Sequence, residues 1–428
     1  MRPPATRSSL APTARLRRAD SPSYMVVVVA EAMGRPIVSW NREATKILPA
    51  LRTWRAALHR EPELADTETK TREKLVGWLG ELGLRPKTYE GFTGVSAVLG
   101  GERSGTTVAL RADMDALAVD ESTGLPYRSR VPGLMHACGH DVHMACVLGA
   151  AALLSRHAES LDGPVKLLFQ PAEEQGAKGG AQPFIDRGCL EKPKVDFIVG
   201  QHVEPGLPLG TIGWKKGPMM ASADHFVMRV HGAGGHAAWP HRGADAVLAA
   251  SEIVVGLQAI VSRRRDPLDP VVISVGMIHG GRLHNVLPEE VVLEGTVRTF
   301  RPETRDSMER LVRERSRLLA RSLGATVRIE YHRGYPVLVN PPAATELVVQ
   351  GLVEEFGESR LRELERPVMG AEDFSRYLEH VPGTFLFLGV GVPGRESTLH
   401  SATFEPPEEV LVTGAAVLAA SVEALQRR

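Results

Sequence analysis

Residues 106–110 (TTVAL) run directly into residues 111–115 (RADMD), so that an apolar strand is followed at once by charged side chains. The same pattern recurs at residues 165–174, where VKLLF leads into QPAEE, and at residues 197–202, where FIVG leads into QH. Apolar strands separated by helical stretches, such as residues 142–157, are typical of a largely parallel sheet covered on both faces. We therefore predict an α/β fold built on these strands.

Polar residues follow the predicted strands and include several potential ligands and proton carriers. Because the carboxyl ends of parallel strands meet at one edge of an open sheet, these side chains are predicted to converge on one crevice. Any one of them could instead be a turn or cap residue, but that explanation fits the whole set poorly. The set comprises Asp113, Asp115, Glu173, Glu174, His202 and, beyond the strand at residues 384–388, His400.

Residues 218–332 show a different order of elements. This order, β-α-β-β-α-β, is that of a split ferredoxin-like unit. A chain of 428 residues is long enough for about two or three domains. We therefore predict an α+β domain at 218–332, inserted between two parts of a larger α/β domain at 45–217 and 333–428. Its strands are expected at residues 225–230, 271–278, 291–300 and 326–331, and its helices at 245–262 and 303–323.

The composition argues against several classes of protein. The 51 Lys and Arg residues balance 51 Asp and Glu, so the chain lacks the basic excess of proteins that bind nucleic acids or anionic membranes. No uninterrupted apolar stretch approaches the roughly 18 residues that span a bilayer. Three cysteines, an odd number, argue against a disulfide scaffold and for a reducing compartment. We expect a cytoplasmic protein without nucleic-acid or membrane partners.

Residues 1–44 are interpreted as an N-terminal extension that is largely disordered. Residues 1–19 are rich in Arg, Pro, Ser and Ala and contain no acidic residue, which is a composition typical of disorder. An Arg-rich, acid-poor start is compatible with a transit peptide. An equal alternative is that the true start of the protein is Met25 or Met33 and that the assigned start lies upstream of it.

The densest cluster of potential metal ligands is HACGHDVH at residues 136–143. Thiol, imidazole and carboxyl groups this close together are typical of metal sites, and Cys138 and His140 flank Gly139 in a predicted loop. Asp141 is expected to cap the helix that follows. Two alternatives remain open: a buried structural cysteine beside surface histidines, and a cysteine nucleophile activated by a histidine.

The acidic pairs predict hydrolytic chemistry. The period of two in a strand points Asp113 and Asp115 to the same side, so that one could reach the metal shell while the other orients a histidine ligand. Adjacent Glu173 and Glu174 must diverge, so that one can bind metal while the other faces a bound water. A carboxylate beside a metal-activated water is what a hydrolase needs as general base.

The predicted insertion supplies three weaker candidates. His236 lies in a turn of small residues, GAGGHAAWPH at 232–241, Asn285 lies in HNVLPE, and Arg298 lies in GTVR. An arginine can bind a carboxylate bidentately. A turn histidine and an exposed strand arginine are equally compatible with this pattern.

Together these motifs resemble one family, the dinuclear metal-dependent amidohydrolases and peptidases, in its N-acyl-L-amino acid amidohydrolase branch. That branch includes hippurate hydrolases and the indole-3-acetyl-amino acid hydrolases of plants. Cys138 is typical of this branch, because other branches have Asp at this ligand. The resemblance rests on LHREPEL (58–64), RADMDAL (111–117), HACGHD (136–141), FQPAEEQGAKGG (169–180), GGHAAWPH (234–241), HNVLPE (284–289), GTVRTF (295–300), MGAEDF (369–374) and LHS (399–401).

The resemblance implies a zinc-peptidase-like catalytic domain whose inserted domain is a lid and dimerisation domain. It implies two divalent ions, of zinc, manganese, cobalt or nickel, and Glu173 as general acid and base, with Asp115 assisting catalysis. His236 would reach the active site of the other subunit of a homodimer and hold the scissile carbonyl, and Asn285 and Arg298 would contact the substrate. The implied metal ligands are Cys138, His140, Glu174, His202 and His400.

The activity implied by the resemblance is hydrolysis of the amide bond of N-acyl-L-amino acids with acetyl, benzoyl or indoleacetyl groups. An N-acetyl-diaminopimelate deacetylase and a dipeptidase or carboxypeptidase are alternatives within the family. A metal-free Cys amidase built on Cys138 would leave the paired glutamates without a role. A non-catalytic homologue acting as a binding protein is the alternative from another class, and the presence of all five implied ligands argues against it.

Overall fold

The computed structural model describes residues 38–176, 178–396 and 398–427. Residues 1–37, which make up most of the predicted N-terminal extension, lie outside the described residues, so its interpretation stays a prediction. The described chain starts with two helices, α2 (Trp40–Lys46) and α3 (Leu48–His59). The two helices meet at Ile47, which follows α2 and precedes α3.

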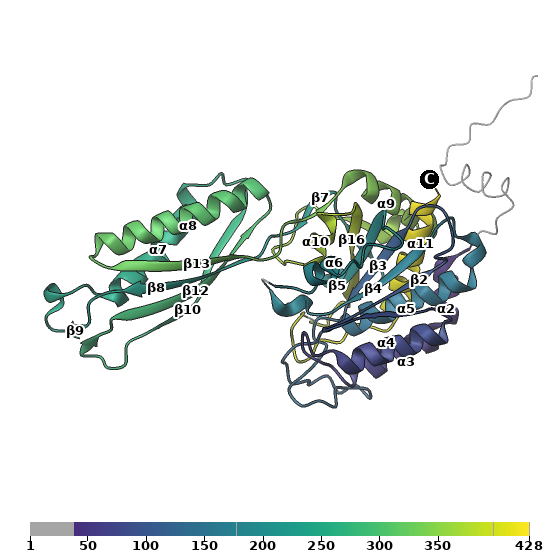
Figure 1. The fold of residues 1–428 in the computed structure, drawn as a ribbon, viewed down its shortest axis with the longest axis horizontal. Coiled ribbons are helices and arrows are strands. Elements are labelled where there is room, and N and C mark those ends of the chain that lie inside the picture. The colour runs from purple at the N-terminus through teal and green to yellow at the C-terminus, as the bar shows by residue number, and fades with distance from the viewer. Residues whose placement is uncertain (1–37, 177, 397, 428) are drawn as a thin grey trace, which may run out of the picture. The chain divides into compact units, whose positions relative to one another are not determined.

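The larger sheet has eight strands in the order β1-β2-β4-β3-β5-β16-β6-β15 (Figure 1). Its four central strands, β4, β3, β5 and β16, run parallel to their neighbours within this group, while β1, β2 and β6 add antiparallel pairs at its flanks. The predicted α/β class with a largely parallel sheet is confirmed. The strands are β1 (Lys87–Tyr89), β2 (Phe92–Leu99), β3 (Val108–Asp113), β4 (Val165–Gln170), β5 (Phe197–Pro208), β6 (Ile212–Trp214), β15 (Leu361–Glu363) and β16 (Gly383–Gly391).

Helices cover both faces of this sheet, because alternate strand residues are apolar and buried on either side. One face packs on α6 (Ala181–Asp186) and α10 (Phe374–Leu378), where Phe184 and Phe374 join strand residues in one core cluster. The other packs on α5 (His140–Arg156) and α11 (Glu409–Gln426). Beside them, α4 (Thr69–Glu81) contacts β2, and α9 (Pro342–Phe356) contacts α11 and β16.

The register of the parallel strands brings their carboxyl ends to the same level. Asp113, the last residue of β3, lies opposite Gln170, the last residue of β4. Arg111 lies opposite Gly200 in β5, which puts His202 level with Asp113 because both strands rise by the same step per residue. The polar residues that follow these strands therefore start from one edge of the sheet.

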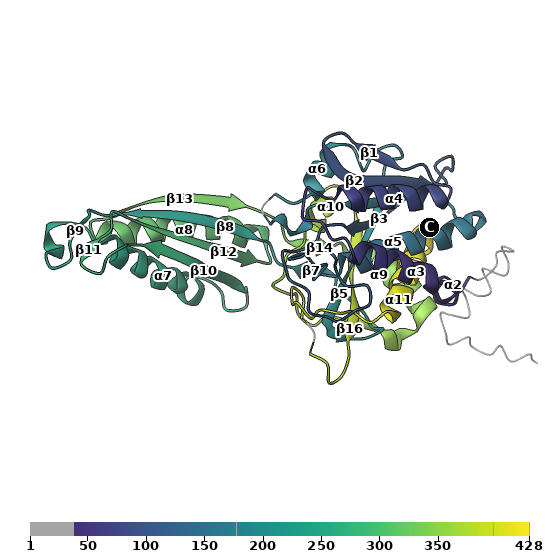
Figure 2. The ribbon, with the colours of Figure 1, turned by 90° about the horizontal axis from the view of Figure 1, so that it is seen from below.

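A second sheet of four antiparallel strands, ordered β10-β12-β8-β13, carries its own core. Two helices, α7 (Ala246–Arg263) and α8 (Pro302–Ser322), pack side by side on it (Figures 1 and 2). The order of elements is the β-α-β-β-α-β order expected from the sequence, while the limits at 218 and 332 stay a prediction. Asp245 caps α7 by accepting from the backbone of Val247 and Leu248. The strands are β8 (Asp224–His231), β10 (Val271–Gly280), β12 (Glu290–Thr299) and β13 (Thr326–Arg333).

Short elements complete the described chain. Two ribbons pair β7 (Gly217–Met220) with β14 (Leu338–Asn340), and β9 (Gly235–His236) with β11 (Val286–Leu287). Four 3₁₀ turns occur at η1 (Ala158–Ser160), η2 (Glu173–Gln175), η3 (Pro240–Arg242) and η4 (Glu358–Arg360).

Two helices, α7 and α11, are long and apolar enough to cross a membrane by length and composition alone. The core helices of globular proteins often meet the same criterion. The most apolar stretch of α11 is 78% buried in the structure, as expected of a core helix, but that of α7 is only 39% buried. Three apolar side chains of α7, those of Val247, Leu248 and Val255, are exposed.

Asp141 does not cap α5, contrary to the sequence-based expectation. The helix begins at His140, and Gly139 with φ 88° occupies the N-cap position. The Asp141 carboxylate is buried and instead accepts hydrogen bonds from Arg55 Nε at 3.1 Å and His59 Nδ1 at 3.0 Å. Since Arg55 and His59 both belong to α3, this ion cluster attaches α3 to the helix that carries the candidate site.

The same cluster gives the free energy of unfolding a dependence on pH. Burial lowers the pKa of His59, but Asp141 and Glu121 outweigh it and raise that pKa from 6.5 to about 9. Because the folded state prefers protonated His59, the stabilisation is fully present below pH 6.5 and is lost as the pH rises through about 9.

We expect His59→Gln to lack this dependence. At about pH 6 the variant should have a lower free energy of unfolding than wild type. This difference should become smaller by on the order of 3 kcal/mol when the pH is raised to about 10. Urea denaturation of both metal-free proteins across this range measures the difference. A deficit that stays constant with pH would show that His59 does not titrate in this way.

Candidate metal centre

Four segments bring the predicted ligands together. Cys138 and His140 flank the start of α5, His202 lies in β5, Glu174 follows β4, and His400 lies in the loop after β16. Gly139 is required between Cys138 and His140, because its φ is 88° and a Cβ there would lie 2.6 Å from a methyl carbon of Val203. The backbone N–H of His400 donates to the carbonyl of Ala137 at 2.9 Å, which joins the last segment to the first.

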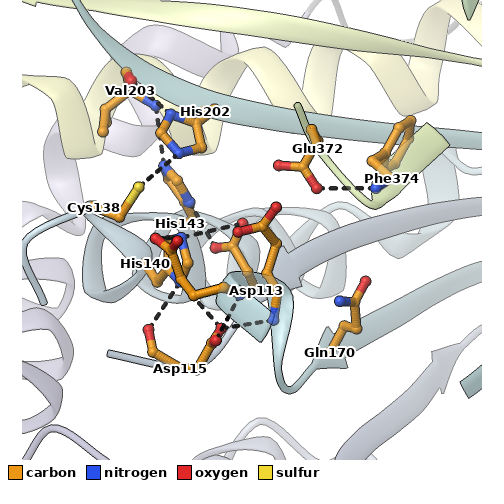
Figure 3. A network of polar contacts seen from close by, with 12 residues as sticks. Asp113, Asp115, Cys138, His140, His143, Gln170, His202, Val203, Glu372 and Phe374 are labelled. Atoms are coloured by element: carbon orange, nitrogen blue, oxygen red, sulfur yellow. Dashed lines mark hydrogen bonds and ion pairs between the residues drawn. The ribbon is translucent and has the colours of Figure 1, made fainter. Parts of the chain in front are cut away.

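Cys138 lies at the centre of the resulting cluster. Its Sγ is 3.3 Å from His202 Nε2 and 3.3 Å from His400 Nε2. Glu174 Oε1 lies 3.2 Å from His400 Nε2 and 4.0 Å from His140 Nε2. The structure therefore brings all five predicted ligands together, and Figure 3 shows Cys138 and His202 facing each other.

The five donors form two groups that share Cys138. The donor atoms of Cys138, His140 and His202 lie within 4.8 Å of one another, and so do those of Cys138, Glu174 and His400. These two groups would supply donors for two cations, and soft thiol and imidazole ligands suit zinc and similar divalent ions.

The protonation states of the histidines also suit metal binding. His140 Nδ1 lies 2.8 Å from the carbonyl oxygen of Asp115, and His202 Nδ1 lies 2.7 Å from that of Val203. A carbonyl only accepts, so Nδ1 carries a proton in each ring and Nε2 is the nitrogen that remains to bind a cation. His140 Nε2 is buried without a hydrogen-bond partner among the described residues. These residues therefore fit a bound cation.

The Cys138 thiol is in an environment that opposes a free thiolate. Burial raises the pKa of this thiol well above its usual range, and the carboxylates of Glu174 and Glu173 raise it further. A reactive cysteine nucleophile needs the opposite, a lowered pKa beside positive charge. The environment favours Cys138 as a ligand whose negative charge is balanced by a cation, and it argues against a metal-free Cys amidase.

A third group of donors, Asp113, His140 and His143, also lies within 4.8 Å, but two of its members are already engaged. Asp113 accepts from His143 Nδ1 at 2.7 Å and from Arg111 Nη1 at 2.8 Å. His143 Nε2 accepts from the backbone N–H of Val203 at 3.0 Å (Figure 3). Asp113 thus orients His143 rather than a predicted ligand.

Asp115 positions the turn that carries the paired glutamates. Its two carboxylate oxygens accept from the backbone N–H groups of Glu173, at 3.0 Å, and Glu174, at 2.9 Å. The backbone carbonyl of Asp115 also lies 2.8 Å from His140 Nδ1, so that Asp115 contacts a predicted histidine ligand. The carboxylate of Asp115 lies 3.4 Å from the same nitrogen.

The turn itself starts with a strained residue. Ala172 has φ 59° and ψ 39°, the left-handed conformation that residues with a Cβ rarely adopt. The buried carboxylate of Glu68 accepts from the backbone N–H of Ala172 at 3.0 Å and from the Thr93 hydroxyl at 2.7 Å. Such strain persists where surrounding contacts enforce it, and it is frequent at functional sites.

Glu173 lies in a buried group of acids. Its carboxylate is within 4.8 Å of those of Glu372 and Asp373, and Arg111 binds the latter two at 3.0 and 2.7 Å. Burial raises the pKa of Glu173 well above its usual range, and the neighbouring carboxylates of Glu372 and Glu174 add to the effect. An elevated pKa favours a carboxyl group that holds a proton and can later release it.

The sequence reasoning assigned no role to Arg111, His143, Glu372 or Asp373. One signal for Arg111 was present, since an arginine inside an apolar strand must find acidic partners if it is buried. Its partners Glu372 and Asp373 lie more than two hundred residues away in the chain. No local pattern predicts that pairing.

The three candidates of the predicted insertion are not part of this cluster. His236 is exposed in β9, where its Nδ1 accepts from the backbone of Ala238 at 3.1 Å and its ring packs on Trp239. The carbonyl of Asn285 accepts from Ala237, and Arg298 lies in β12. Within the ranges that the structure describes, the contacts of all three are local to this part of the chain.

Comparison with known proteins identifies similar chains. Residues 109–424 match the model of peptidase family M20/M25/M40. The chain is 43% identical over 337 residues to an N-acetyl-L-cysteine deacetylase of Bacillus subtilis, covering 78% of this chain and 79% of that protein. It is 39% identical over 369 residues to an IAA-amino acid hydrolase, ILR1-like 4, of Arabidopsis thaliana, covering 85% and 82%.

Solved structures share the fold. A dinuclear metal-binding peptidase of the M20 family from Bacillus subtilis superimposes with a TM-score of 0.76 at 32% sequence identity. The match covers 90% of this chain and 99% of that one. The similarity therefore extends through both sheets described above.

Proposed function

The chain belongs to peptidase family M20/M25/M40, and from this premise we propose that it hydrolyses the amide bond of N-acyl-L-amino acids, releasing a carboxylate and a free amino acid. It is a metal-dependent amide hydrolase, as relatives with deacetylase and amino acid hydrolase activities indicate. The acyl groups we propose are acetyl, benzoyl or indoleacetyl. Because its three cysteines are free thiols, we further propose a reducing, cytoplasmic location.

One observation carries the proposal: two donor groups share Cys138, and the turn that supplies Glu174 to one of them also supplies Glu173. We propose Cys138, His140, Glu174, His202 and His400 as ligands of two divalent ions, of zinc, manganese, cobalt or nickel. When bound, such ions polarise a carbonyl group and lower the pKa of a water molecule. Glu173 is adjacent to a ligand in sequence but has no ligand role in this assignment.

Glu173 is the general base and then the general acid in the proposed reaction. Its carboxylate accepts a proton from the attacking water and passes it to the nitrogen of the scissile amide, which leaves as the amine of the amino acid. The neighbouring acids Glu372 and Asp373 make a negative charge on Glu173 unfavourable, and this helps Glu173 to keep the proton that it accepts. Arg111 compensates the charge of these acids.

The substrate's other contacts are proposed to come from the predicted insertion. His236 would donate a hydrogen bond to the oxyanion of the tetrahedral intermediate, a contribution often worth several kcal/mol. Arg298 would bind the carboxylate of the substrate, and Asn285 its acyl end. Because the described contacts of His236 are local, we propose that it acts in the active site of a second copy.

The proposal is tested by amino-acid release from N-acetyl, N-benzoyl and indoleacetyl amino acids, with and without a chelator and with added Mn²⁺, Zn²⁺ or Co²⁺. We expect release that the chelator abolishes and a metal restores. Release only from dipeptides or from N-acetyl-diaminopimelate would replace the proposed substrate class with another. The absence of hydrolysis with every substrate and metal, from folded protein, would contradict the enzymatic function.

We propose a homodimer formed through the second sheet. Strand β10 is an edge strand, and its Met277 and Ile278 are 45% and 50% exposed. On α7, Val255 is 69% exposed and Leu248 is 48% exposed. An unpaired strand beside an apolar helix surface is a surface that a second copy can cover by extending the sheet.

Charge on this surface is expected to separate the subunits. Val255→Glu combined with Ile278→Lys should convert a dimer into a monomer in sedimentation or light-scattering measurements, because both side chains would have to be buried on association. If His236 acts in the active site of the other subunit, activity should be lost as the dimer dissociates. A matched control is Leu318→Glu on α8, where a residue that is 64% exposed lies outside the proposed interface. A wild-type monomer with full activity would contradict the proposal.

A further inference from the structure

The chain leaves the four-stranded sheet at Arg333, the last residue of β13, and reaches β14 at Leu338. This return segment, residues 334–337, is held by several polar contacts. The Gly334 carbonyl accepts from Arg305 Nη2 at 2.9 Å and from Arg376 Nη2 at 2.8 Å. The Gly334 N–H donates to Asp224 at 3.2 Å.

The return segment is also joined to the outgoing one. The backbone N–H of Ala223, immediately before β8, donates to the carbonyl of Tyr335 at 3.0 Å. Asp224, at the start of β8, is buried and is bound by two nitrogens of Arg305 at 2.6 to 3.2 Å. These bonds hold the two connections between the sheets to each other.

The Tyr335 side chain extends from this unit to the catalytic turn. Its hydroxyl donates to the backbone carbonyl of Glu173 at 2.5 Å, and the residue is only 4% exposed. Burial raises the pKa of this hydroxyl, as do the carboxylates of Asp373 and Glu173, so it remains protonated and able to donate.

Gly179 leaves space for the tyrosine ring. Its φ is 55°, and a Cβ there would lie 2.7 Å from a ring carbon of Tyr335 and 2.7 Å from an oxygen of Asp373. The ring is therefore packed against the same segment that carries the paired glutamates. A phenylalanine could keep this packing while losing only the hydroxyl.

The backbone of the Glu173 turn is held by hydrogen bonds from two other parts of the chain besides Tyr335. Glu68 holds the N–H of Ala172, and Asp115 holds the N–H groups of Glu173 and Glu174. Glu68 is the N-cap residue of α4, and Asp115 follows β3 by two residues, so both belong to the part of the chain built around the larger sheet. Tyr335 alone among these anchors comes from the connection to the four-stranded sheet.

We infer that Tyr335 is a positioning residue for the proposed reaction: its hydroxyl ties the connection between the two sheets to the backbone of Glu173. The inference rests on the proposed function, because it assigns Tyr335 a role in placing the proposed general base and the neighbouring ligand Glu174. Replacing a residue that orients a metal ligand typically changes metal affinity or turnover by about 10- to 100-fold. Small misplacements of reacting groups have effects of similar size.

Tyr335→Phe is the direct test, with Tyr331→Phe as its matched control. Tyr331 also donates a hydroxyl to Asp224, at 3.0 Å, but it does not contact the Glu173 turn. We expect Tyr335→Phe to lower kcat by about 10- to 100-fold with KM within about threefold of wild type, because substrate contacts are untouched. Tyr331→Phe should leave kcat within about twofold although it loses a comparable hydrogen bond.

A second readout does not depend on turnover. Titration of the metal-free proteins with Mn²⁺ alone should give a Kd about tenfold weaker for Tyr335→Phe than for Tyr331→Phe, since Glu174 lies on the same turn. Unchanged kcat and unchanged Mn²⁺ affinity in Tyr335→Phe would overturn the inference, and so would equal losses in both variants. A wild-type protein inactive on every N-acyl amino acid would refute the proposed substrate class, while the Mn²⁺ titration would still decide the role of Tyr335.

Discussion

Glu173→Gln is expected to lower kcat by at least about 10³-fold while both metal ions stay bound. General acid–base catalysis by a positioned side chain typically contributes about 10²- to 10⁴-fold, and Glu173 would serve in two successive proton transfers. Glutamine retains the shape of the side chain but cannot accept a proton from water. Its backbone N–H and carbonyl can keep their bonds to Asp115 and Tyr335, so the turn should persist.

The neighbouring variant Glu174→Gln separates catalysis from metal binding. Glu174 Oε1 faces His400 and His140, so its replacement should reduce metal content as well as turnover. We expect metal analysis to give full occupancy for Glu173→Gln and partial occupancy for Glu174→Gln. Substantial turnover by Glu173→Gln, or metal loss equal to that of Glu174→Gln, would contradict the assignment of Glu173 as the base.

Short-range patterns were sufficient to predict the sheet and the convergence of polar side chains at its edge, whereas the choice of five ligands rested on the resemblance to a family. Apolar strands that end in acids, as at Asp113 and Glu173, are visible within ten residues, and the order of parallel strands then brings their ends together. The thiol and imidazole of HACGHD are likewise local. The structure places Cys138 against His202 and His400 although the three lie in segments far apart in the chain.

What the sequence could not predict are contacts between backbone groups and distant side chains. The two carboxylate oxygens of Asp115 bind amides that start 58 residues later, and no spacing rule encodes such a bond. Asp141 was expected to cap a helix because acids at helix starts usually do, but a buried Arg55 and His59 provide stronger partners than the helix N-terminus. The role of a polar residue near a helix start thus depends on what the opposite helix presents.

Cys138→Ala is expected to release both ions rather than one. The Cys138 sulfur belongs to both donor groups, so its loss leaves each proposed site with two protein donors. Because changes outside the ligand set alone cost about 10- to 100-fold in metal affinity, removal of a shared ligand should weaken both sites by more than about 100-fold. Metal analysis after dialysis should find less than one ion per chain, and turnover should fall with it.

Cys146→Ala provides the matched control, because Cys146 is also a free, fully buried cysteine of the α5 region but contacts the Leu411 carbonyl instead of the ligands. It should keep its metal and its activity apart from a modest loss of stability. Retention of two ions per chain by Cys138→Ala would contradict the proposal that Cys138 serves both sites. Loss of only one ion would assign Cys138 to a single site. The other site would then bind its ion without Cys138. Since a thiolate ligand must be deprotonated, wild-type protein should also lose its metal as the pH falls.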